Sequence, residues 1–150
     1  MRGHIILAAA IAIAGAGQAV ADDLVRVKTD KSVTAAMDSL QAAVEGAGAT
    51  VFARVDHAAG AQKVDMELGD AQVLIFGNPK LGTPAMQADP LAGLFLPLKV
   101  LAYGDADGQV WLVYESPKEM LDDLDIDDDA EYVQKMTGAL AKLTGKAAGS

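Results

Sequence analysis

Residues 96–114 read LPLKVLAYGDADGQVWLVY, two apolar runs joined by a short polar turn. The runs at 96–103 and 109–114 flank residues 104–108, and the Asp-Gly pair in that turn suits backbone positions with positive φ. Alternation within the second run assigns its side chains to two opposite faces. The stretch therefore predicts a β-hairpin, and the hairpin leads us to expect an antiparallel sheet.

Three further strands and a helix are predicted on the N-terminal side of the hairpin. Residues 24–29, 51–55 and 71–76 have strand-like apolar patterns, and the last is nearly all apolar, as expected of an interior strand. Ser32 is a candidate N-cap for a helix between the first two strands. The apolar stripe of that helix is Val33, Met37, Leu40 and Val44.

The remaining segments complete an α+β pattern. Residues 58–69 suggest a short helix or a structured loop, and an amphipathic helix is predicted near the C-terminus. The apolar stripe of this last helix is Tyr132, Val133, Met136, Leu140 and Leu143. We expect a single β-α-β-β-β-β-α domain, with helices on one face of a largely antiparallel sheet.

The N-terminal residues have the pattern of an export signal. Arg2 and His4 precede an apolar stretch at 5–16, and an Ala-x-Ala site ends at Ala21. We expect a signal peptide over 1–21, cleaved near Ala21, and a mature domain over 22–150 in the periplasm or secreted. The chain has no cysteine, so thiolate metal sites, cysteine nucleophiles and Cys-x-x-Cys-His haem attachment are absent.

The charge of the chain argues against two classes of partner. The net charge is −9, and Lys and Arg do not cluster in the mature chain. Binding to nucleic acid or to an anionic membrane depends on clustered positive charge. We therefore expect no nucleic-acid partner and no stable membrane association.

Residues 77–90, GNPKLGTPAMQADP, could in principle form a phosphate-binding loop. Gly77 and Gly82 have the spacing of a Walker motif, but Thr83 and Pro84 follow where Lys and Ser or Thr are needed. The segment is better interpreted as a rigid corner after a strand, with Thr83 as an N-cap and Pro84 as the first residue of a short helix.

Other sites remain as alternatives. His57 could act as a general base supported by Lys80 or Tyr114, or it could bind a metal or haem together with Met66 or Met86. The aspartate run at 122–129 has part of an EF-hand spacing but lacks its glycine and its final glutamate. Neither a catalytic residue nor a cofactor is assigned on these patterns.

Nearly the whole mature chain resembles a known family. The carrying segments are HAAGA at 57–61, IFGNPK at 75–80, GTP at 82–84 with the following Met-Gln, LPL at 96–98, and the hairpin turn with its second strand. They resemble the bacterial and archaeal family called domain of unknown function 302. The resemblance implies a β-α-β4-α domain, similar to one half of the TATA-binding-protein-like fold, and a homodimer; it implies no activity.

The resemblance also marks candidate positions for a shared pocket or interface. These are His57, Asn78, Lys80, Thr83, Gln87 and Tyr114. We expect a small-ligand-binding or interaction module, with a metal or haem carrier and a small enzyme as alternatives. The segment after the third strand could instead form a dimer interface through Leu81, Pro84, Met86, Leu91, Leu94 and Phe95.

Overall fold

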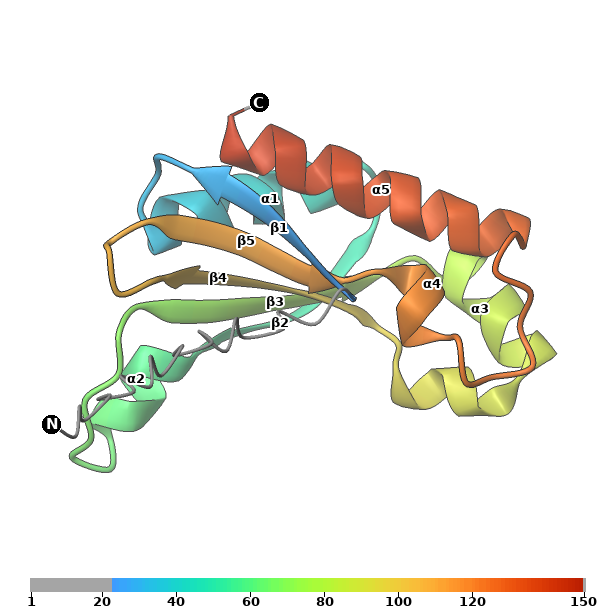
Figure 1. Ribbon diagram of the computed structural model, residues 1–150, viewed down its shortest axis with the longest axis horizontal. Coiled ribbons are helices and arrows are strands. Elements are labelled where there is room, and N and C mark those ends of the chain that lie inside the picture. Colours follow the sequence, from blue (N-terminus) through green and yellow to red (C-terminus); the bar gives the residue numbers. More distant parts are fainter. Residues whose placement is uncertain (1–22, 150) are drawn as a thin grey trace, which may run out of the picture.

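Five strands form one sheet in the order β1-β5-β4-β3-β2, and every neighbouring pair is antiparallel (Figure 1). The computed structural model describes residues 23–149, so the predicted signal peptide lies outside the described residues. The strands are β1 (Leu24–Thr29), β2 (Thr50–Asp56), β3 (Ala71–Gly77), β4 (Leu98–Gly104) and β5 (Val110–Glu115). The predicted hairpin is β4–β5, and Gly108 has the positive φ, 80°, that its turn requires.

The two long helices cover the same face of this sheet (Figure 1). They are α1 (Val33–Gly46) and α5 (Glu131–Ala148), and Ser32 caps α1 by accepting a hydrogen bond from the Ala35 N–H at 3.2 Å. The shorter elements are α2 (His57–Gln62), α3 (Pro79–Ala88), the 3-10 helix η1 (Pro90–Leu94) and α4 (Pro117–Met120). No helix within residues 23–149 has the length and apolarity that a membrane span requires.

The core lies between the helices and the covered face of the sheet. Met37 and Leu40 of α1 are buried against it, as are Met136 and Leu140 of α5. The buried strand side chains below them are Leu74, Phe76, Leu98, Val100, Ala102, Leu112 and Tyr114. These are the alternating positions of β3, β4 and β5, so the predicted α+β domain with helices on one face is confirmed.

The predicted start of the helix after β3 is wrong. Asn78, not Thr83, is the N-cap of α3, Pro79 is its first residue, and Pro84 lies inside it. Both Asn-Pro and Thr-Pro are helix-start signals, and the first follows directly on the last residue of β3. Pro84, the sixth residue of α3, has no N–H to donate to the carbonyl of Lys80, so one backbone hydrogen bond of the helix is missing there.

A β-bulge interrupts β2. Val51 lies opposite Phe76 of β3, and Ala53 lies opposite the next residue, Ile75, so Phe52 is an additional residue in β2. The insertion reverses the alternation of side chains beyond it. Arg54 consequently lies opposite buried Leu74 and faces α1.

Candidate functional site

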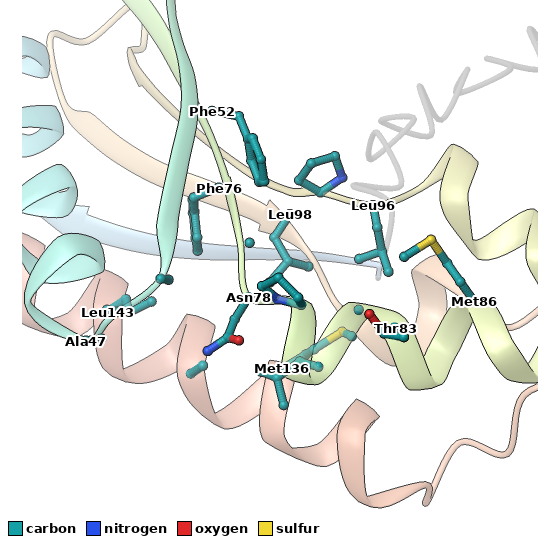
Figure 2. A pocket seen from close by; sticks show the side chains of 17 residues that line it. Ala47, Phe52, Phe76, Asn78, Thr83, Met86, Leu96, Leu98, Met136 and Leu143 are labelled. Atoms are coloured by element: carbon teal, nitrogen blue, oxygen red, sulfur yellow. The ribbon is translucent and has the colours of Figure 1, made fainter.

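A pocket of about 290 Å³ lies where α3 and α5 meet the end of β3 (Figure 2). Its walls include Phe76 and Leu98 from the sheet and Met136 and Leu143 from α5, each at most 8% exposed. Apart from Asn78 and Thr83, every residue that lines it is apolar or glycine. The pocket is therefore a concave apolar surface with few polar groups, which is the common character of small-molecule sites.

Exposed apolar side chains border the pocket. Phe52, the additional residue of the bulge, is 58% exposed, and Met86 of α3 is 40% exposed. Figure 2 shows Phe52 and Phe76 on the sheet side, with Met86 and Leu96 across from them. An apolar ligand could bury Phe52 and Met86 further, because both side chains still expose surface to water.

Two glycines leave room in this pocket. A Cβ atom added to Gly77 would lie 3.5 Å from Phe52 Cε2 and 3.5 Å from Pro97 Cβ. At Gly82 it would lie 3.6 Å from Leu96 Cδ1. These are ordinary contact distances, so a methyl group at either position fits and takes up space inside the pocket.

Asn78 is the polar side chain set into this apolar lining. It is half-buried, and its Oδ1 accepts a hydrogen bond from the Lys80 N–H at 3.0 Å as the N-cap of α3. The second polar residue, Thr83, is exposed on α3. The cap fixes the direction of the Asn78 amide.

The opposite end of the β2–β3 pair holds a polar network. Arg54 donates from Nη1 to Asp38 Oδ1 at 2.6 Å, and from Nε and Nη2 to Gln72 Oε1 at 2.9 and 2.7 Å. Gln72 Nε2 in turn contacts Thr34 Oγ1 and Asp56 Oδ2, each at 3.3 Å. These hydrogen bonds connect α1, β2 and β3, so the network has a structural role.

Residues 25–143 match the family described as "Domain of unknown function DUF302". The chain belongs to this family. A DUF302 crystal structure, that of an uncharacterised conserved protein from Bacillus stearothermophilus, superposes with a TM-score of 0.76 at 16% identity, over 85% of this chain and 99% of that one. At this identity the likeness supports a shared fold.

Curated relatives of this DUF302 protein are longer. "Fluoride-specific ion channel FluC 1" of Brucella suis biovar 1 (strain 1330) is 40% identical over 94 residues, which is 63% of this chain and 37% of the relative. FluC 1 of Brucella abortus biovar 1 (strain 9-941) matches at the same identity and length, over 35% of the relative. The chain spans about a third of the length of these relatives.

Of the six candidate positions in the DUF302 domain, two line the pocket. These are Asn78 and Thr83. Lys80 and Gln87 lie on α3 but are exposed and do not line the pocket. Tyr114 is buried in the core on β5, where burial raises the pKa of its phenol and a hydrogen bond with Thr144 opposes that rise.

His57 lies far from this pocket. It is exposed at the first position of α2, beyond the end of β2 that pairs with the start of β3. Asn78 follows the other end of β3, and seven residues of strand span about 20 Å. Figure 1 shows α2 and α3 at opposite ends of the sheet. The structure therefore does not bring His57 together with Lys80, and the pocket borders Phe52 instead of His57.

The structure bears on the metal alternatives only in part. Within residues 23–149, no three His, Cys, Asp or Glu side chains gather closely enough to hold a metal ion. Met86 lies at the pocket, at the other end of the sheet from His57, and Met66 is 65% exposed. In the acidic run, Asp128 pairs with Lys118 at 3.2 Å and raises the pKa of that lysine.

Proposed function

We propose that this DUF302 protein is an exported binding module for a small, mostly apolar molecule. The pocket between α3 and α5 carries the proposal, because its lining is apolar apart from Asn78 and Thr83 and its volume is about 290 Å³. This is about twice the volume of the ~150 Å³ apolar cavity that holds one benzene molecule. A ligand of roughly twelve non-hydrogen atoms would fit by the same proportion.

Export is compatible with this arrangement. The predicted cleavage site near Ala21 precedes β1, which begins at Leu24. Cleavage there would leave all five strands and the pocket intact. The proposed site of action is therefore the periplasm or the exterior, where the module would meet small molecules before they enter the cell.

Fluoride is a poor match for this pocket. A small anion leaves water only for N–H donors or cations that replace its hydration. The residues that line the pocket include no Lys, Arg or His, and their only polar side chains are Asn78 and Thr83. The ligand that we propose is accordingly independent of the ion named for the Brucella relatives.

Binding can be tested by thermal unfolding with indane and naphthalene as apolar probes. At ten times its Kd, a ligand in the pocket should raise Tm by about 5 °C. Gly82→Ala should weaken binding, because its added methyl occupies pocket space near Leu96. Gly138→Ala on α5 is the matched control, since a Cβ there meets no atom within 4 Å.

Both glycine variants should raise the stability of the free protein, because alanine stabilises a helix by about 0.5–1 kcal/mol relative to glycine. Only Gly82→Ala should lose affinity for the probes. Equal affinities of the two variants, or no Tm shift with any apolar probe, would contradict a ligand in this pocket.

A second proposal, a homodimer, is favoured by the apolar surface of η1. Leu91 is 56% exposed and Leu94 is 78% exposed, shortly after Met86 at the pocket. Exposed leucines grouped in this way suit a contact between two copies. Native mass spectrometry should find a dimer for the wild type and a monomer for Leu94→Glu, whereas Val64→Glu, on the segment after α2, should remain dimeric. A monomeric wild type would rule the proposal out.

A further inference from the structure

We infer that the ligand of this pocket is a neutral apolar compound carrying one hydrogen-bond acceptor, which the side-chain amide of Asn78 binds. This inference rests on the proposed function of the pocket and narrows its ligand to a chemical class. Ketones, esters and ethers of about twelve non-hydrogen atoms belong to that class. The inference depends on the orientation of one side chain and on the absence of charge around it.

The orientation of the Asn78 amide follows from the helix cap. The backbone N–H of Lys80 can only donate, so the Asn78 atom that it contacts at 3.0 Å must be the amide oxygen. The amide nitrogen is then the free end, and it forms no hydrogen bond with any residue between 23 and 149. Asn78 thus offers two N–H donors to a ligand while its oxygen is occupied.

The place of this donor suits recognition. Asn78 lines the pocket and is half-buried, whereas Thr83 is exposed. Figure 2 shows the Asn78 side chain on the side of the pocket that α5 closes, among apolar groups that include Met136 and Leu143. A ligand oxygen loses its hydrogen bonds to water when it enters the pocket, and a hydrogen bond from the Asn78 amide nitrogen replaces one of them. An apolar atom at the same place would leave the N–H groups unpaired.

The lining also selects against charge. A carboxylate or an ammonium group that enters an apolar site must be paired, or its burial is costly. The residues that line the pocket include no charged side chain that could pair with either group. The amide of Asn78 can satisfy one neutral acceptor, and no charged side chain in the lining pairs with a full charge.

Three probes with one ring skeleton test this inference: 1-indanone, which has a carbonyl acceptor, indane, which has none, and indane-1-carboxylate, which is charged. Calorimetric titration of the full-length mature protein gives a Kd for each. We expect 1-indanone to bind about fivefold more tightly than indane, as one net hydrogen bond allows. The carboxylate should bind more weakly than indane.

Asn78→Asp is the decisive variant. Aspartate is as good an N-cap as asparagine, and its charge suits a helix N-terminus, so the fold should be retained with little change in Tm. The variant removes the two N–H donors. The preference for 1-indanone over indane should fall from about fivefold to none, and indane serves as the internal measure of pocket integrity.

Two controls separate Asn78 from other effects. Thr83→Val removes the exposed hydroxyl and should keep the fivefold preference. Ser32→Asp introduces the same charge at the N-cap of α1, away from the pocket lining, and should also keep it. Loss of the preference in Thr83→Val alone would assign the contact to Thr83 and overturn the role of Asn78.

The outcomes distinguish this inference from the proposed function. Equal Kd values for 1-indanone and indane, a preference that survives Asn78→Asp, or tightest binding of the carboxylate would overturn the inference and leave an apolar binding module standing. Failure of all three probes to bind would overturn the proposed function, and the inference with it.

Discussion

The two ends of the β2–β3 strand pair bury the same face of the sheet in opposite ways. At one end Phe76 borders the pocket, and at the other Gln72 belongs to the network with Arg54, although both residues lie on the helix-facing side of β3. Directional hydrogen bonds fix one end, and apolar packing that leaves free volume forms the other. The free volume of the pocket therefore lies at the end that apolar packing forms.

The largest expected effect comes from the apolar end. Phe76 is 2% exposed, and Phe76→Ala should lower the free energy of unfolding by about 3 kcal/mol or more, because it removes a buried ring and leaves a larger cavity. Urea unfolding measures this loss. Phe76→Leu keeps much of the volume and should cost less. A loss below about 1 kcal/mol for Phe76→Ala would show that packing does not stabilise this end.

A smaller loss is expected at the polar end. Gln72→Ala should lower the free energy of unfolding by about 2 kcal/mol, because Arg54 Nε loses its acceptor and Nη2 keeps only a longer contact of 3.4 Å to the Thr34 carbonyl. Gln62→Ala is the matched control on exposed α2 and should stay within about 0.5 kcal/mol of the wild type. Equal free energies of unfolding for the two variants would contradict a structural role of the network.

The smallest effect is expected at a polar contact on the surface of the β4–β5 hairpin, which belongs to neither end of the β2–β3 pair. Trp111 Nε1 donates to Asp105 Oδ2 at 2.8 Å, and this bond lowers the pKa of Asp105, with backbone N–H groups of Gln109 and Asp107 and the charge of Lys28 adding to it. A carboxyl whose folded pKa is lowered stabilises the fold above its unfolded value and loses that contribution as the pH falls.

Asp105→Asn should therefore lower Tm at neutral pH. The difference from the wild type should decline as the pH falls through 3.8, the ordinary value for aspartate, and disappear below the lowered pKa of the folded state. Circular dichroism melts across this range measure it. A Tm difference that does not change with pH would mean that the carboxylate charge contributes nothing.

Local sequence patterns predicted most of the fold. The hairpin turn, the Ser32 cap and the apolar stripes of α1 and α5 are each encoded within a few neighbouring residues, and they hold in the structure. The start of α3 was misplaced because two cap-and-proline signals lie five residues apart. Helix-start propensity alone does not distinguish the two signals, whereas the position at which β3 ends does.

Only some of the predicted candidate positions lie together in the structure. Asn78 and Thr83 line the pocket, whereas His57 belongs to the opposite end of the sheet. The antiparallel pairing of β2 and β3 already implies this separation, because the residue after β2 and the residue after β3 then lie at opposite ends of the strand pair. The apolar walls could not be predicted, since they come from α5 and from strands that are distant in sequence.

The Arg54 network depends on a feature that the sequence pattern does not reveal. Simple alternation over residues 51–55 places Arg54 on the same face as Phe52 and opposite to Val51. The bulge at Phe52 reverses this and turns Arg54 toward α1. An insertion of one residue is invisible to a period-two pattern of only five residues.

The bulge at Phe52 also affects the exposed edge of the sheet. β2 is the outermost strand on its side of the sheet, and it exposes the apolar side chains of Phe52 and Val55, at 58% and 39%. An unbroken apolar edge strand is a template on which further chains can add and aggregate. The additional residue breaks the regular spacing of backbone N–H and C=O groups along that edge, so the exposed apolar side chains of β2 do not lie on an unbroken template for further strands.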